Sequence, residues 1–126
     1  MKLKLSVLIM QGDSTQNILS DDYIGVVVTD NGEFPSIYVS TKTIPETLQQ
    51  LYSEFSNLDC RWASPILSNL RHEHGAADSE ALYRVLIPEG TLSLKKGRLC
   101  KLGNLELEGF YVRSIIEQPR SPSQRF

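Results

Sequence analysis

One amphipathic helix, with strand-like segments on both sides of it, most constrains how this chain can fold. Within residues 43–58 the apolar side chains recur every three or four positions and form one stripe: Ile44, Leu48, Leu51, Phe55 and Leu58. Thr43 and Glu46 have the spacing of a capping box, and Pro45 suits the first turn, where its missing N–H is not needed. The sequence therefore predicts a helix over residues 43–58 that packs against neighbouring strands.

The segments before this helix are typical of strands. Residues 2–5 alternate lysine with leucine, which indicates a strand with one solvated face. Residues 23–30, "YIGVVVTD", are apolar and β-branched, which predicts a central strand buried on both faces. The pair Asn31-Gly32 then precedes "PSIYVST", and such a pair between two strands is a strong signal of a tight turn. We therefore expect residues 23–40 to form an antiparallel hairpin.

The segments after the helix predict further strands and a second helix. Residues 60–67 read as extended, residues 68–79 as a loop or an irregular hairpin, and residues 80–88 as a strand. Residues 91–102 read as two short strands, and the apolar positions beyond residue 111 favour a terminal helix.

This order of elements predicts the fold class α+β, with a mixed β-sheet flanked by helices. A chain of 126 residues is long enough to bury a core without disulfides or metals. We therefore expect a single domain over residues 1–118, followed by a flexible C-terminal tail over residues 119–126. The only tryptophan, Trp62, is expected to pack in the core, and a place on a binding surface is the alternative.

The formal net charge of −2 lacks the excess of cations that is typical of proteins binding nucleic acid or anionic membranes. The apolar run around Lys2 and Lys4 is too short for a signal peptide, and no stretch approaches the length of a membrane span. Cys60 and Cys100 lie in strand-like surroundings without a partner motif, which favours two buried, inert thiols in a reducing compartment. We expect a cytoplasmic protein that binds neither nucleic acid nor membranes.

The strand pair that runs directly into the helix, with "NLDCRWASPIL" and "EALYRVLIPEGT" after it, resembles the Nudix superfamily. In that family a strand pair leads into a loop and helix with the pattern GX5EX7REUXEEXGU, the Nudix box. Glutamates of the box hold divalent metal ions for the hydrolysis of nucleoside diphosphate derivatives. The resemblance covers most of residues 20–118 and implies a Nudix-like α/β/α sandwich in which this helix is a degenerate box.

The match to the Nudix box keeps few of its acidic residues. The resemblance places Glu54 on the first helix glutamate, after Ser53 instead of arginine, and places Glu46 near the upstream glutamate. The two further glutamates of the box fall on Asn57 and Leu58, and neither side chain supplies a carboxylate for a hard cation. The resemblance therefore implies that Glu46 and Glu54 are the catalytic candidates if the protein is active, and it favours an inactive box.

A second group of candidates lies in "RHEHGAADSE". Binding residues concentrate on loops, so four consecutive residues are candidates for the rim of a ligand pocket: Arg71, His72, Glu73 and His74. The two histidines would point the same way on a strand and, together with Asp78, could ligate zinc. A polar, partly exposed loop is the simpler interpretation.

Three functions remain open from the sequence. The first is a catalytically inactive Nudix-like domain that acts as a binding or assembly module, without a cofactor, for a protein partner or a nucleotide-type ligand. The second is a Mg-dependent pyrophosphohydrolase, whose helix carboxylates Glu46 and Glu54 would act with loop carboxylates and whose metal ligands would be Glu54, Glu73 and Asp78, with Glu80 nearby. The third is an unrelated α+β protein-interaction module. The sequence does not identify the partner or the oligomeric state.

Overall fold

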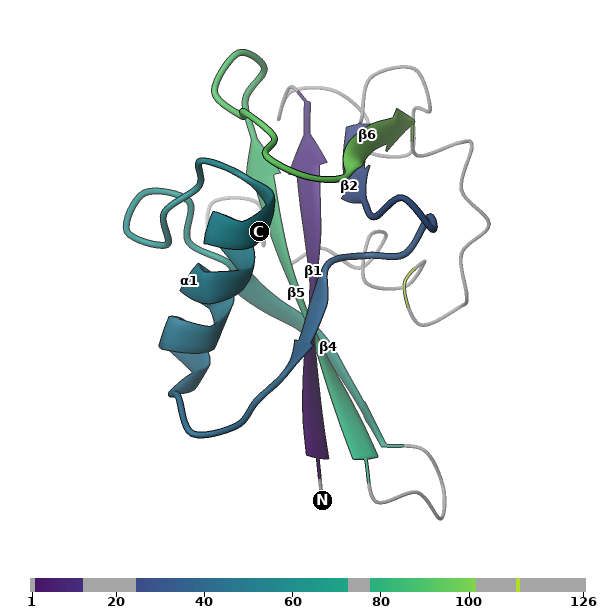
Figure 1. Ribbon diagram of the computed structural model, residues 1–126, viewed down its shortest axis with the longest axis vertical. Helices are drawn as coiled ribbons and strands as arrows, with labels where there is room; N and C mark the ends of the chain where they lie inside the picture. Colours follow the sequence, from purple (N-terminus) through teal and green to yellow (C-terminus); the bar gives the residue numbers. More distant parts are fainter. Residues whose placement is uncertain (1, 13–24, 73–77, 102–110, 112–126) are drawn as a thin grey trace, which may run out of the picture.

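A computed structural model describes residues 2–12, 25–72, 78–101 and 111 of the chain (Figure 1). The described residues form a six-stranded mixed sheet with one α-helix, which agrees with the predicted α+β class. The elements follow in this order: β1 (Lys2–Gln11), β2 (Gly25–Val28), β3 (Ser36–Tyr38), α1 (Ile44–Phe55), β4 (Ile66–His72), β5 (Asp78–Ile87) and β6 (Arg98–Lys101). Most of the predicted terminal helix and all of the predicted tail over residues 119–126 lie outside the described residues.

The strands lie in the order β4-β5-β1-β2-β6, and β3 also pairs with β1 (Figure 1). β1 and β5 run parallel over ten residue pairs, from Lys2 opposite Asp78 to Gln11 opposite Ile87. All other pairings are antiparallel. The chain therefore crosses from β1 to its parallel neighbour through β2, β3, α1 and β4, and the long β1–β5 ladder forms the centre of the sheet.

β1 is more deeply buried than its sequence predicts. The lysine–leucine alternation indicates one solvated face, and only the first three residues of the strand and its last residue, Gln11, keep some exposure. From Leu5 to Met10 every side chain is buried, because both faces of the strand are covered. The prediction of one solvated face rests on residues 2–5 and does not extend to the rest of β1, where both faces are buried as far as Met10.

The predicted hairpin over residues 23–40 forms its turn but not its strand pairing. The N–H of Gly32 donates to the carbonyl of Thr29 over 2.9 Å, and Gly32 adopts a positive φ of 80°. Instead of pairing with each other, β2 and β3 both pair with β1, with Val26 opposite Met10 and Ser36 opposite Ser6. The turn thus lies between two strands, β2 and β3, that both pair with the same edge of β1. The expectation that β2 is buried on both faces is confirmed for all three of its valines.

α1 forms as the sequence predicts. Thr43 caps it, since its hydroxyl accepts from the N–H of Glu46 at 3.3 Å and donates to the Glu46 carboxylate at 2.8 Å. Pro45 occupies the first turn. Ser56 ends the helix in an extended conformation, and its N–H donates back to the carbonyl of Tyr52.

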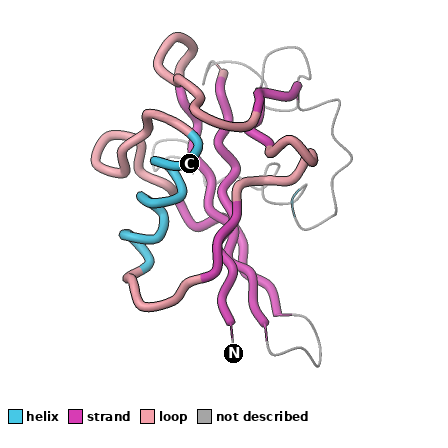
Figure 2. Tube along the Cα trace, in the orientation of Figure 1, coloured by secondary structure: helices cyan, strands magenta, loops and turns pink. Residues whose placement is uncertain are grey.

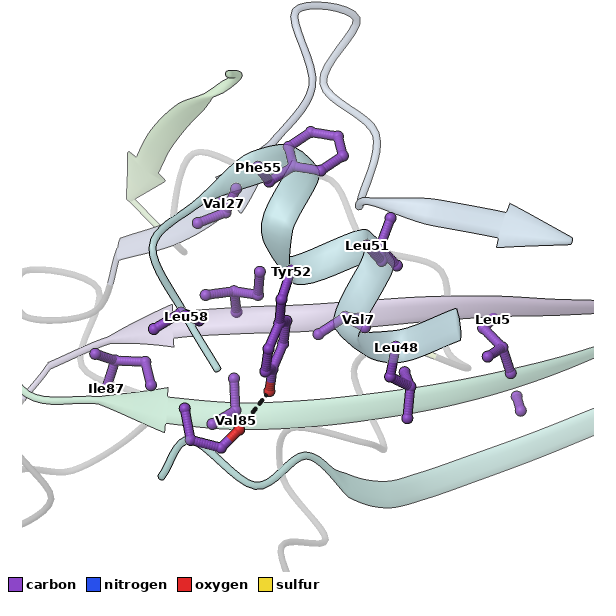
Figure 3. Packing of buried hydrophobic residues seen from close by; sticks show 13 residues of the cluster. Leu5, Val7, Val27, Leu48, Leu51, Tyr52, Phe55, Leu58, Val85 and Ile87 are labelled. Carbon is purple, nitrogen blue, oxygen red and sulfur yellow. Dashed lines mark hydrogen bonds between the residues drawn. The ribbon is translucent and has the colours of Figure 1, made fainter. Parts of the chain in front are cut away.

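The helix covers one face of the sheet (Figures 2 and 3). Tyr52 and Leu51 are fully buried against the odd-numbered residues of the central strands, such as Val7 and Val85. The even-numbered residues point to the opposite face, where a smaller apolar cluster gathers: Leu8, Met10, Val26 and Leu82, packed against Phe34, Leu86 and Tyr111. Strand alternation thus gives β1 and β5 two buried faces.

The segment between α1 and β4 is a turn rather than the predicted extended stretch. The N–H groups of Trp62 and Ala63 both donate to the carbonyl of Asp59. The turn projects Trp62 outward, and its side chain is 53% exposed, so the prediction that Trp62 lies in the core is wrong. β4 and β5 form the expected irregular hairpin, with a register shift between Leu67 and Asn69.

The second predicted strand pair, over residues 91–102, is also paired differently. Leu94 makes an isolated bridge to Ser56 at the end of α1, whereas β6 pairs with β2. Among the described residues, no helix is long and apolar enough to cross a membrane.

Candidate functional site

The two helix carboxylates predicted as catalytic candidates lie at opposite ends of α1. Eight residues separate Glu46 from Glu54, which corresponds to about 12 Å along a helix. Glu46 belongs to the N-terminal cap through its bond to Thr43. Glu54 forms an exposed ion pair with Lys96, whose ammonium also lies 5.0 Å from the centre of the Phe55 ring. The two carboxylates therefore do not meet at one site.

Asn57 and Leu58, which the Nudix resemblance places on the two further glutamates, have structural roles. Leu58 is 2% exposed and belongs to the core. The Asn57 side chain accepts from the N–H of Ser93 at 2.8 Å and donates to the carbonyl of Thr91 at 2.9 Å. It thereby ties the end of α1 to the segment that leads into β6.

A first cleft, of about 350 Å³, lies between the C-terminal end of α1 and the turn after β2. Glu54 lines it together with Asp30 and Glu33 from the turn, and Lys96 closes it from the segment before β6. Across the described residues, no three His, Cys, Asp or Glu side chains gather as a metal site, in this cleft or elsewhere.

Of the residues predicted for a pocket rim or a metal site near residue 71, the structure brings Arg71 and Asp78 together on the walls of a small cleft of about 190 Å³, which Glu80 also lines. Arg71 points to the face of the sheet away from α1 and donates to Glu80 Oε1 from Nε at 3.1 Å and from Nη2 at 2.8 Å. His72 is on the next position of β4, where its Nδ1 lies 2.6 Å from the hydroxyl of Ser79. Asp78 is exposed, whereas Glu73 and His74 lie outside the described residues.

Glu80 is a buried carboxylate, only 7% exposed, and the structure surrounds it with donors. Besides Arg71, the hydroxyl of Ser6 donates at 2.6 Å and that of Tyr111 at 3.0 Å. Burial raises the pKa of Glu80, but these hydrogen bonds and the charge of Lys4 outweigh it and lower the pKa overall. Glu80 is thus an ionised structural anchor on the face opposite α1, and it cannot act with Glu54 on the helix side.

A second cleft, of about 550 Å³, lies beside the end of β5. Its walls come from the turn after α1, from the start of β4 and from the end of β5: Trp62, Ala63, Ser64, Ile66, Arg84, Val85, Leu86, Ile87, Pro88 and Thr91. β4 begins at Ile66, opposite Arg84, so the last three residues of β5 have no neighbouring strand on this side within the described chain. The cleft occupies the space that this short β4 leaves beside β5.

Arg84 is the ionisable residue on the walls of this second cleft. It is 6% exposed, and its Nε, also buried, has no hydrogen-bond partner among the described residues. Burial lowers the pKa of its guanidinium. The cleft therefore combines one desolvated cation with mainly apolar walls.

The wall that carries Trp62 is held firmly to α1. The hydroxyl of the buried Tyr52 donates to the carbonyl of Ala63 at 2.8 Å (Figure 3). The side chain of Gln49 donates to the carbonyl of Leu58 and accepts from the N–H of Cys60 at 2.7 Å. These bonds fix both ends of the turn, so the position of Trp62 is set by the core.

The two thiols are less buried than the sequence predicts. Cys60 and Cys100 are both free and half-buried. Burial, helped by the charge of Asp59, raises the pKa of the Cys60 thiol, which keeps it protonated and a poor nucleophile.

Comparison with known proteins gave no match, since no protein-family model fits the chain and no curated protein is significantly similar to it.

Sequence reasoning missed Arg84, and it gave Trp62 a place on a binding surface only as the alternative to the core. A signal for Arg84 exists in "EALYRVLIP", because Arg84 is in phase with Leu82 and Leu86 on one face of the strand. A cation in the apolar phase of a buried strand is unusual and indicates either a buried partner or a ligand. No comparable sequence signal indicates that Trp62 is exposed, since its exposure depends on a turn that is hydrogen-bonded to Tyr52 and Gln49 of α1.

Proposed function

We propose that this protein is a non-catalytic binding module with a Nudix-like arrangement of strands and helix, in which the box helix has become structural. The single observation that carries the proposal is that the residues at the positions of the Nudix box have structural roles in the fold. Glu46 caps the helix, Asn57 ties it to the following segment, and Leu58 fills the core. Each position has a local structural role, and none of these roles requires a metal ion.

The electrostatics of Glu54 also support a binding role. A Nudix-type reaction requires several carboxylates one helical turn apart, so that they hold Mg²⁺ against phosphate oxygens. Glu54 instead neutralises Lys96, and Asn57 and Leu58 stand where the next carboxylates would be. We infer a soluble cytoplasmic domain whose partner is a protein or a nucleotide-type small molecule.

One observation favours the Mg-dependent hydrolase as a second candidate. Asp30 and Glu33 line the first cleft together with Glu54, so three acidic residues border the same space. If a metal ion entered the cleft with a substrate, rotation of these three side chains toward it would give a set of metal ligands that differs from the Nudix box. The hydrolase therefore stands as the alternative that the experiment has to exclude.

The experiment is a turnover assay of the whole chain with Mg²⁺ or Mn²⁺ and a panel of nucleoside diphosphate derivatives. The binding module predicts no release of phosphate-containing products above the metal-only background. Turnover that Glu54→Gln abolishes would overturn the proposal and establish the hydrolase. Because the Glu54–Lys96 pair is exposed, the variant is expected to fold with a stability change of less than about 1 kcal/mol. Glu46→Gln serves as the matched control on the same helix.

A further inference from the structure

Arg84, whose buried Nε finds no hydrogen-bond partner within the described residues, sets the second cleft apart from the other clefts. A buried charge is normally paired or hydrogen-bonded, because its removal from water is otherwise unfavourable. Across the sheet, Arg84 faces Leu8 on β1 and Ile66 on β4, and neither side chain can accept a hydrogen bond. The sheet therefore holds the cation in place without neutralising it.

The same strand shows what a neutralised charge looks like in this protein. Glu80, four positions earlier on the same face, lies opposite Lys4 on β1 and Arg71 on β4. Its carboxylate accepts four hydrogen bonds, from Ser6, Arg71 and Tyr111. The fold thus surrounds one buried charge of β5 with partners, whereas Arg84 lines an open cleft.

The remaining walls of the cleft add two further kinds of contact. Trp62, half-exposed on a turn that is bonded to α1, offers an aromatic surface. Ser64 and Thr91, which carry hydroxyl groups, also line the cleft. A volume of about 550 Å³ is within the range of small-molecule sites, which combine apolar walls with a few well-placed polar groups.

We propose that this cleft binds a small organic oxyanion, with its carboxylate or phosphate on the guanidinium of Arg84 and its apolar or aromatic part against Trp62. A guanidinium suits this role because its planar fork can donate two parallel hydrogen bonds to an oxyanion. An aromatic ring next to Trp62 buries apolar area and gains from ring stacking. The inference rests on the proposed binding function and assigns it a site that lies apart from Glu54 and the box helix carboxylates.

The only tryptophan of the chain lines this cleft, so its fluorescence reports binding directly. The probes are benzoate and phenyl phosphate, with inorganic phosphate as the anion without a ring and benzyl alcohol as the ring without a charge. We expect a saturable fluorescence change with at least one of the two aromatic anions, and at least tenfold weaker binding of both control compounds. The stronger of the two aromatic anions identifies the oxyanion as carboxylate or phosphate.

The matched variants are Arg84→Met, which removes the buried charge, and Arg98→Met, which removes an exposed charge from β6. Arg84→Met is expected to weaken anion binding at least tenfold, whereas Arg98→Met changes it less than twofold. Calorimetric titration of the same probes repeats the measurement without depending on tryptophan.

Two results would overturn the inference: no saturable binding of either aromatic anion by both methods, or equal affinities in the two arginine variants. Its failure is distinguishable from that of the proposed function. Metal-dependent turnover that needs Glu54 would refute the non-catalytic role, whereas anion affinity that is independent of Arg84 would refute only this site. Glu54→Gln is expected to leave anion binding unchanged, because Glu54 lines the other cleft.

Discussion

Replacement of Arg84 by methionine is expected to make the protein more stable, although most substitutions of buried residues have the opposite effect. Arg84 is only 6% exposed, its Nε has no hydrogen-bond partner in the part of the chain that the structure describes, and its cross-sheet neighbours Leu8 and Ile66 are apolar. Methionine has a similar length, is unbranched and adapts to irregular space. It therefore removes an uncompensated charge and keeps most of the apolar contacts of the arginine stem.

The size of the effect follows from the unsatisfied group. A buried donor without a partner costs about 1–3 kcal/mol, and more when the group is charged. Arg84 lines the open cleft, so we take the lower part of that range and expect a gain of about 1–2 kcal/mol for Arg84→Met. For a domain of this size, such a gain raises Tm by roughly 3–10 °C.

The assay is urea unfolding followed by circular dichroism, with the m-value compared between variants so that a change of midpoint reports stability. Arg98→Met, at an exposed position of β6, is the control and is expected to remain within about 0.5 kcal/mol of the parent protein. A loss of stability in Arg84→Met would refute the reasoning, because it would mean that the folded protein pairs this guanidinium after all.

Three further substitutions test the rest of the fold. Glu80→Gln is expected to cost about 2 kcal/mol at pH 7. The contacts of Glu80 lower its pKa, so the ionised carboxylate contributes its full stability to the fold above the pKa of the unfolded chain. This contribution is lost as the pH falls through the pKa of the folded protein. The difference in unfolding free energy between parent and variant, measured by urea unfolding, should therefore disappear in acid. Gly97→Ala should cost about 3 kcal/mol, since a Cβ there would clash with the carbonyl oxygen of Val28. Gly90→Ala has a similar positive φ but open space and should cost about 1 kcal/mol, and equal losses would contradict this. Tyr52→Phe, which leaves a buried carbonyl unpaired, should lower the unfolding free energy by about 1–2 kcal/mol, and an unchanged midpoint would show that the bond is not formed in solution.

The helix could be predicted because all of its signals are local. The cap at Thr43, the proline in the first turn and the apolar stripe lie within sixteen residues, and each has its expected role in α1. The turn at Gly32 is local as well, and it forms. The strand pairing around that turn is not local, because it depends on β1. This strand is longer than β2 and β3, and both pair with it instead of with each other.

The site could not be predicted for a related reason. The cleft beside β5 exists because β4 starts opposite Arg84 and because Tyr52 and Gln49 hold the preceding turn against α1. Both conditions join residues that are far apart in the sequence. The sequence places an arginine in the apolar phase of a strand, but only the register shows which side chains face it.

Register also explains why two buried charges on one strand have different consequences. Glu80 and Arg84 are four residues apart, so they lie on the same face of β5, separated by about 13 Å. The ladder places cations opposite the first and aliphatic side chains opposite the second. Shifting β4 by four positions would bring Arg71 beside Arg84 and leave Glu80 without its strongest donors. The observed register therefore satisfies the anion and leaves the cation available, which is the arrangement that a binding site for an oxyanion requires.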